Sequence, residues 1–243
     1  MLGGMGLPAR DRELVQIMAT ALADAARRAG DWLVCRAGCT PCCHGAFAIN
    51  ALDAARLKAG IDALKASDPQ LAESIGHRAR MWIDAHGAAF PGNLAKGQLG
   101  QSDEDRERFE GFANDAACPA LNGATGHCDV YAWRPMTCRV FGPPVRVDAG
   151  GEQALGHCEL CFHGASEAEI ASCEMPVPHQ LEAQILKDME RENLERENTE
   201  RENLERENTE RENTERENTE RENTERDQAD GGAETVVAFA LLG

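Results

Sequence analysis

The sequence predicts a mainly α-helical domain with short β segments, built around a cluster of cysteines and followed by a charged repeat. Three stretches in the first 87 residues place apolar side chains at helical spacing and are bounded by capping or breaking residues. Farther along, short apolar runs such as 130–133 and 145–147 lie between Gly and Pro residues, as in turns and short strands. The pentad Arg-Glu-Asn-(Leu/Thr)-Glu then occurs seven times from Arg191 to Glu225.

Capping residues define the first three expected helices. Residues 9–29 present one apolar face, and a glycine follows them. Asn50 is a favourable N-cap, and the apolar spacing after it predicts a second helix that stops near Ser67. An Asp-Pro pair then opens a third helix, which we expect to end before Gly87 because glycine interrupts the pattern there.

The elements after the third helix are expected to be shorter. The glycine-rich segment 87–100 predicts a loop, and Ser102 caps a short charged helix. Ser166 and Glu169 have the spacing of a capping box, which predicts another brief helix. A last helix begins near His179 and leads into the repeat.

The repeat divides the chain into three expected parts, which are a domain over 1–186, a charged spacer over 187–228 and an apolar tail over 229–243. On a helix each pentad advances by about 500°, so the repeat forms no continuous apolar stripe. We expect a solvated rod that continues the preceding helix for part of its length and is frayed beyond. A fully helical repeat would carry the tail away, whereas a disordered one would let it return and pack as a strand or helical turn.

Charge and composition exclude several classes of partner. The formal net charge is −17. Residues 191–226, which are the repeat and the arginine after it, have 14 Glu and 8 Arg, a net charge of −6, so the rest of the chain carries −11. Such a field repels nucleic acid and anionic membranes, and we expect neither as a partner. The N-terminus lacks a basic segment followed by an apolar one, so we expect a reduced, cytoplasmic protein in which clustered cysteines bind metal.

The densest group of cysteines is Cys35, Cys39, Cys42 and Cys43, which we call the knuckle. Cys39 and Cys42 have two residues between them. Thiolates with this spacing can bind the same tetrahedral ion without strain in the backbone, so this group predicts a metal site. Adjacent thiols usually point apart, and we therefore expect Cys42 and Cys43 to serve different ions or only one of them to be a ligand. The alternatives are a disulfide scaffold and inert buried thiols.

Further candidate ligands lie in two later groups, which are Cys118, Cys128 and Cys138, and then Cys158 and Cys161. The first three are too far apart in sequence to bind one ion through local spacing, so the fold must bring them together. Arg134 and Arg139 are expected in the outer shell of the centre, where they offset the negative charge of thiolates. The tenth cysteine, Cys173, is expected in the core. These groups predict a small metal-centred α+β domain with one or two centres.

The cysteine pattern resembles that of the CxxCxxCC family of zinc- or iron-chelating domains over about residues 35–165. The matching motifs are Cys35-x3-Cys39-x2-Cys42-Cys43, Cys118-Pro, Cys128-Asp-Val-Tyr, Arg134-Pro-x-x-Cys138-Arg and Cys158. The resemblance implies an iron–sulfur cluster or iron, with zinc as the alternative, and supplies no substrate. The chain departs from the motif in having three residues between Cys35 and Cys39, which makes Cys35 the least secure ligand.

Three functions are compatible with this pattern. The first is an iron–sulfur redox or cluster-handling protein, in line with the label of oxidoreductase that members of the family carry. The second is a structural zinc module, in which metal binding stabilises the fold. The third is a metal-dependent enzyme, for which the resemblance offers the flagellin lysine N-methylases as an example, with a histidine completing the coordination sphere. The candidate histidines are His44, His127, His157 and His163. No catalytic residue is identified.

Overall fold

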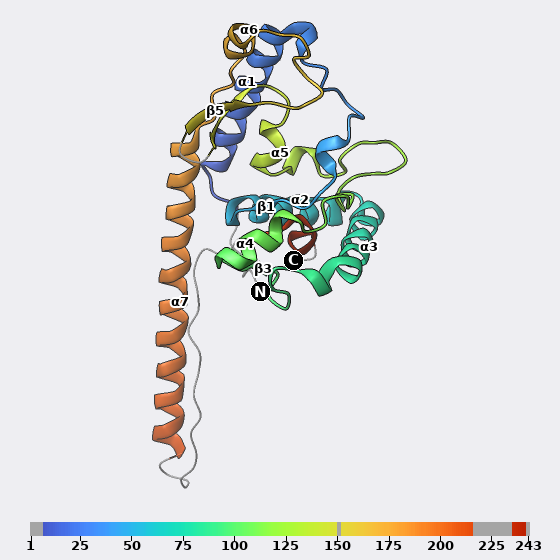
Figure 1. Cartoon of the computed structure of the whole chain (residues 1–243). Helices are drawn as coiled ribbons and strands as arrows, with labels where there is room; N and C mark the ends of the chain where they lie inside the picture. The colour runs from blue at the N-terminus through green and yellow to red at the C-terminus, as the bar shows by residue number, and fades with distance from the viewer. Residues whose placement is uncertain (1–6, 150–151, 216–234, 242–243) are drawn as a thin grey trace.

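The computed structural model describes residues 7–149, 152–215 and 235–241, and it confirms a mainly α-helical fold with short β segments (Figure 1). The helices are α1 (Asp11–Ala29), α2 (Ala51–Ser67), α3 (Pro69–His86), α4 (Asp103–Glu110), α5 (Met136–Val140), α6 (Glu167–Ser172), α7 (His179–Glu215) and α8 (Val237–Ala240). The strands are β1 (Ala48–Ile49), β2 (Gly92–Asn93), β3 (Gln98–Leu99), β4 (Val145–Ala149), β5 (Glu152–Gly156) and β6 (Thr235–Val236). Short 3-10 helices cover Gly30–Trp32, Pro41–Cys43, Gly87–Ala89 and Tyr131–Trp133.

The expected helix boundaries are confirmed by the caps. The side chain of Asn50 accepts a hydrogen bond from the N–H of Asp53, 3.0 Å away, and so satisfies an N–H group at the start of α2. Ser166 and Glu169 form both hydrogen bonds of the capping box at α6. The segment 87–100 is not wholly a loop, because its two ends pair as the antiparallel strands β2 and β3.

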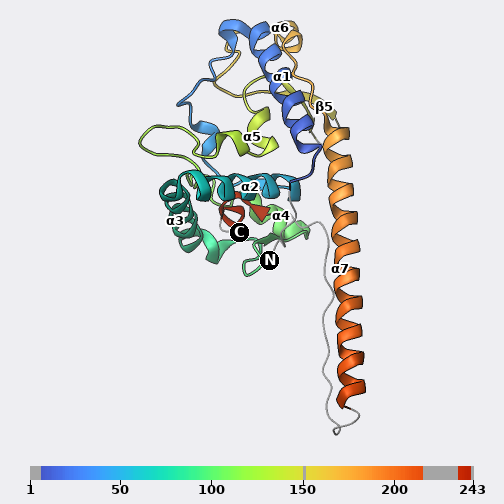
Figure 2. The ribbon, with the colours of Figure 1, turned by 180° about the vertical axis from the view of Figure 1, so that it is seen from behind.

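The core has two main parts, one on each side of α2. One part lies where α2 meets α3 and α8, around Leu57 and Ile75, which are fully buried. The other lies where α2 meets α1 and α7, around Leu14 and Ile185. Figures 1 and 2 show α2 crossing the middle of the domain between these elements. The central helix thus holds the two parts of the domain together.

A buried ion-pair network links α1, α2 and α5. The guanidinium of Arg56 binds the carboxylates of Asp11 and Asp53, and all three side chains are almost completely buried. Asp53 also accepts a hydrogen bond from the N–H of Met136, 2.8 Å away, at the start of α5. Because unpaired buried charges are costly, this network fixes the position of α5 relative to α2.

The C-terminal tail returns to the domain, although α7 leaves it. Helix α7 packs on the core through Ile185 and Met189 and then extends away as a rod (Figures 1 and 2). From Met189 to Glu215 an α-helix rises about 39 Å. The tail nevertheless pairs β6 with β1 in antiparallel register, with Val236 opposite Ala48. The 19 residues of 216–234, which include the part of the repeat expected to fray, lie outside the described residues, and an extended chain of that length can span about 60 Å.

In the described ranges, we find no helix with both the length and the apolar composition that a bilayer span requires.

Candidate metal centre

The knuckle follows α1 and is shaped by two tight turns. Gly38 has a φ of +85°, a conformation that glycine adopts without strain. Pro41–Cys43 forms a 3-10 turn, in which the N–H of Cys43 donates to the carbonyl of Thr40 at 2.8 Å. The turns fold the knuckle back on itself, so that its thiols lie close together.

Backbone pairing places Cys118 beside the knuckle. The N–H of Cys118 donates to the carbonyl of Cys43 at 2.7 Å, and the N–H of Gly45 donates to the carbonyl of Ala116 at 2.9 Å. These bonds belong to an antiparallel bridge between His44 and Ala117. Two cysteines that are far apart in sequence therefore become neighbours.

Arg78 holds Cys118 and Cys128 in the same region. It extends from α3 and donates through Nε to the carbonyl of Pro119 at 2.7 Å. Its Nη2 lies 2.6 Å from Oδ2 of Asp129. Since Pro119 and Asp129 are each adjacent to a cysteine, one guanidinium fixes both segments through charge-assisted hydrogen bonds.

Cys138 lies on α5, and Arg139 positions the segment before it. Arg139 donates to the carbonyls of Ala132, at 2.7 Å, and Arg134, at 3.2 Å. Burial lowers the pKa of Arg139 to about 10, and the charge of Arg134 contributes to the shift. Arg139 therefore braces the backbone before Cys138, and its expected outer-shell role stays a prediction.

Four thiols form an inner group, namely Cys43, Cys118, Cys128 and Cys138. The ionised forms of Cys118 and Cys128 both repel that of Cys138, and this repulsion adds to burial in raising its pKa. Charges of the same three thiolates also raise the pKa of Cys43, although a hydrogen bond from Cys42 outweighs them and lowers it. Such interactions require proximity, so the fold brings together thiols from four separate segments.

Backbone N–H groups are directed at two sulfurs of the inner group. Burial raises the pKa of Cys118 to about 11, but the N–H groups of Ala120 and Leu121 oppose that rise by hydrogen bonding to its sulfur. The N–H of Val130 acts in the same way on Cys128. Hydrogen bonds of this kind stabilise metal-bound thiolates, because they place positive ends of dipoles at the negative sulfur.

The remaining candidate thiols continue outward from the inner group. Burial raises the pKa of Cys35, and the charges of Cys39, Cys42 and Cys158 raise it further. Cys161 is buried and contacts Cys158 through a side-chain hydrogen bond. These interactions link the outer candidate thiols to the inner group. Cys173 is buried, as expected, and it lies in the same apolar cluster as Cys161, against which Cys158 packs.

Arg134 lies among these thiols. Its positive charge lowers the pKa values of Cys35, Cys42, Cys128 and Cys138, in opposition to burial. Its guanidinium carbon lies 4.1 Å from the centre of the Tyr131 ring. Its Nε is the one buried side-chain nitrogen or oxygen without a hydrogen-bond partner in the part of the chain that the structure describes. Arg134 is thus close enough to act on several thiols, and its outer-shell role at a metal centre stays a prediction.

The thiols of Cys42 and Cys43 influence each other. Their interaction raises the pKa of Cys42 and lowers that of Cys43. Cys43 is therefore the thiol of this pair that ionises more easily. Both residues lie in the 3-10 turn Pro41–Cys43. That they serve different ions, or that only one of them is a ligand, stays a prediction.

The four candidate histidines lie at the surface. They are His44, His127, His157 and His163, and all are exposed. Within the described ranges, no set of three or more Cys, His, Asp or Glu side chains is already arranged to hold a metal ion. Coordination by the inner group therefore requires that its side chains rotate toward a common point.

A comparison with protein families matches residues 34–159 to the family described as "CxxCxxCC: Putative zinc- or iron-chelating domain". The matched region is more than half of the chain and contains every predicted ligand except Cys161. The chain belongs to the CxxCxxCC family. Searches of curated proteins and of solved structures found no match. Membership supports binding of zinc or iron.

The donors of this CxxCxxCC domain fit such a metal. Sulfur ligands are abundant, N–H groups point at Cys118 and Cys128, and Arg134 supplies positive charge beside them. Each of these features favours the deprotonated thiolate, which is the form that binds metal.

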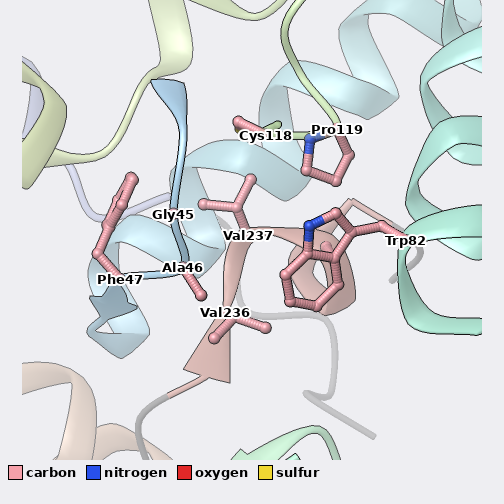
Figure 3. A pocket seen from close by; sticks show the side chains of 9 residues that line it. Gly45, Ala46, Phe47, Trp82, Cys118, Pro119, Val236 and Val237 are labelled. Atoms are coloured by element: carbon pink, nitrogen blue, oxygen red, sulfur yellow. The ribbon is translucent and has the colours of Figure 1, made fainter. Parts of the chain in front are cut away.

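A small apolar pocket borders the inner group of the CxxCxxCC domain. Figure 3 shows Cys118 and Pro119 on one side of it, and Val236 and Val237 of the tail with Trp82 on the other. The tail lies outside the matched residues, yet it covers the side of the family domain that contains Cys118.

Sequence reasoning missed the residues that position the thiols. Arg78 and Asp53 were not singled out, because a charged residue on an amphipathic helix is usually solvated. A usable signal existed for Asp129, since it directly follows a candidate ligand. Arg56 offered another, because it lies four residues after Leu52 on the buried side of α2.

Proposed function

We propose that this protein binds its metal through the thiolates of Cys43, Cys118, Cys128 and Cys138, and that the occupant is iron or an iron–sulfur cluster with a redox role. The observation that carries the proposal is that these four thiols, each from a separate segment of the chain, lie close enough to act on one another. An exposed disulfide scaffold would need no backbone N–H groups at its sulfurs, whereas a thiolate centre does.

The number of thiols supports an iron–sulfur cluster. Four thiolates suffice for one tetrahedral zinc ion, but five more cysteines lie next to the inner group. A cluster or a second centre accounts for this surplus. When bound, an iron–sulfur cluster would supply one-electron transfer, with a potential set by hydrogen bonds to its sulfurs and by exposure.

The protein's own residues have defined tasks in this centre. The N–H groups of Ala120, Leu121 and Val130 stabilise the thiolate forms of the cysteines that they face, which are Cys118 and Cys128. Arg134 opposes protonation of the neighbouring thiols. Arg78 keeps the segments that carry Cys118 and Cys128 in place.

A structural zinc site is the second candidate. It is supported by the burial of the inner thiols and by the family description, which names zinc as well as iron. In that case the metal would stabilise the fold, and no redox change would accompany binding.

Preparation of the full chain without oxygen separates these candidates. We expect iron together with acid-labile sulfide and a visible absorbance that bleaches on reduction. Colourless protein with stoichiometric zinc would replace the first candidate by the second. A folded, reduced protein that binds neither metal would contradict both.

Two serine variants test the assignment of ligands. Cys128→Ser removes an inner thiol and should lower the bound metal per chain and the melting temperature together. Cys173→Ser changes a buried thiol that is not among the four proposed ligands, and it should leave the metal content unchanged. Equal metal content in the two variants would refute the proposed ligand set.

A further inference from the structure

The C-terminal tail docks in a groove formed by elements that precede the repeat. Strand β6 pairs with β1, and α8 packs against α2 and α3. The hydroxyl of Thr235 donates to the carbonyl of Gly97, in the hairpin of β2 and β3. The ring of Phe239 packs edge-to-face on that of Phe90, with 5.2 Å between the ring centres. We call this site the tail groove. It holds the tail as it would hold a separate peptide, by strand addition and by apolar side chains.

The tail covers apolar surface that the domain would otherwise expose. Gly97 leaves room for Phe239, because a Cβ at Gly97 would lie 2.7 Å from the ring. The tail belongs to two apolar clusters of the domain, one around Leu57 and Ile75 and the other around Phe90. Five of its apolar residues are at most 7% exposed, namely Val236, Val237, Ala238, Ala240 and Leu241. An empty groove would return this surface to water, so we expect every folded domain to hold a tail.

Helix α7 carries the chain away from the tail groove. Met189 still packs in the core, whereas Leu194 is already 50% exposed. In both views the far end of α7 lies outside the domain, while α8 lies within it (Figures 1 and 2). The chain has 19 residues, 216–234, between Glu215 and Thr235.

The length of this connection opposes docking within one chain. A relaxed coil of 19 residues spans about 24 Å, which is less than the roughly 39 Å that an α-helix rises from residue 189 to residue 215. An extended chain of the same length can cover the distance, but extension costs conformational entropy. Binding of a tail to its own domain is therefore possible and entropically unfavourable.

Two copies of the chain with antiparallel α7 helices reduce this cost. The far end of each α7 then lies beside the domain of the other copy, so the connection has a shorter distance to cover. The contacts in the tail groove are the same as before, and only the chain that supplies the tail differs. Exchange of an identical element is a low-cost route to a two-fold dimer, because it needs no new interface.

We propose that the tail groove binds the tail of a second copy of this chain, which gives a two-fold dimer in which each tail completes the core of the other chain. Within one chain the tail competes for the groove at an effective concentration on the order of 1 mM. The closed monomer therefore dominates in dilute solution, and the share of the dimer rises with protein concentration. Metal binding has no part in this inference.

Photo-crosslinking of mixed isotopic labels tests the exchange in the full chain. Phe239 is replaced by the photoreactive p-benzoylphenylalanine, for which its partly exposed position leaves room. Unlabelled and ¹⁵N-labelled chains are mixed in equal amounts, incubated until the composition is constant and irradiated. Mass spectrometry then shows whether the linked peptides of the tail and the tail groove carry the same label. At near-millimolar protein, exchange predicts that about half of these cross-links join a light chain to a heavy one, and that the share falls on dilution.

Sedimentation of the same samples measures the dimer, whose share should rise together with that of the mixed cross-links. Val237→Asp should abolish both, and Leu204→Asp, on the exposed side of α7, should change neither. Cross-links that join only like labels at every concentration would overturn the inference. A dimer without mixed cross-links would also overturn it, because its interface would lie elsewhere, and so would the absence of any cross-link to the tail groove. None of these outcomes bears on the proposed metal centre.

Discussion

At the scale of single residues, neighbouring groups shift the pKa values of the thiols in opposing directions. Burial and mutual repulsion favour protonated thiols, whereas Arg134 and the backbone N–H groups favour thiolates. A metal ion resolves this competition, because its positive charge replaces the protons. In the metal-free protein the balance lies on the side of the thiols, so metal binding must release protons.

Arg134→Gln tests the contribution of the central guanidinium. Loss of its charge should raise the pKa values of Cys35, Cys42, Cys128 and Cys138, and metal must then displace protons that are held more tightly. The midpoint of zinc loading should therefore move to higher pH. A pH titration of zinc content measures the shift.

The matched control for this change is Arg80→Gln, which removes the same charge at an exposed position of α3. The control should leave the midpoint in place. Equal midpoints in all three proteins would show that Arg134 has no influence on the thiols.

The metal-free protein should lose stability at alkaline pH. The pKa of Cys118 is raised from 9.0 to about 11 in the folded state, so unfolded chains release this proton first as the pH rises. Stability from this group is complete below pH 9.0 and is lost as the pH increases toward about 11. Urea unfolding of metal-free protein across this range measures the decline.

Cys118→Ser provides the comparison, since serine does not ionise in this range. The variant should lose less stability than the wild type between the same two pH values. An identical decline in both proteins would mean that other groups account for it.

At the scale of elements, close contacts with α2 position the segment that carries Arg134. Trp133 lies directly on Gly60, where a Cβ would come within 2.6 Å of the indole ring. The hydrogen bond from Met136 to Asp53 fixes the next turn to the same helix. Helix α2 is therefore the platform for Arg134 and for Cys138, although it contributes no ligand.

Gly60→Ala should push Trp133 away and displace Arg134, the next residue in the chain. Overpacking outweighs the gain in helix propensity, and we expect a loss of about 1–2 kcal/mol in the free energy of unfolding. Zinc affinity should fall as well. Chemical denaturation and a zinc titration measure the two effects.

Gly123→Ala is the matched control, because a Cβ at this loop position would meet no atom within 4 Å. Its stability and zinc affinity should stay near those of the wild type. A Gly60→Ala variant that behaves like this control would contradict the role given to α2.

Most elements could be predicted from the sequence, but their arrangement could not. The helices α1, α2 and α3 begin and end where Asn50, Asp68 and the glycines indicate, because capping is a local interaction. The meeting of Cys43 with Cys118 depends on a backbone bridge between distant segments, for which the sequence carries no local signal.

At the scale of the whole molecule, the C-terminal tail packs on the domain, although a long charged repeat separates the two in the sequence. Val236 and Val237 are buried against residues that precede the repeat, and they cover the pocket beside Cys118. Helix α7 carries only two apolar residues of the repeat, Leu194 and Leu204, and both are about half exposed. The repeat thus lies in the sequence between two parts of one core, and its role as a spacer stays a prediction.

Val237→Asp should destabilise the domain by about 3 kcal/mol or more, since it places an uncompensated charge in an apolar interior. It should also expose Cys118 to alkylating reagents. Thermal unfolding and the rate of alkylation at Cys118, followed by mass spectrometry, measure both effects. Leu204→Asp makes a similar change on the exposed face of α7 and should alter neither. Equal behaviour of the two variants would mean that the tail does not pack on the domain in solution.

X-ray absorption spectroscopy of the metal-loaded protein tests the central claim most directly, because it reports the atoms bound to the metal. Coordination by the inner thiols predicts a first shell of sulfur only, at about 2.3 Å for zinc. A first shell of nitrogen or oxygen in the fully reduced, folded protein would contradict a centre formed by Cys43, Cys118, Cys128 and Cys138.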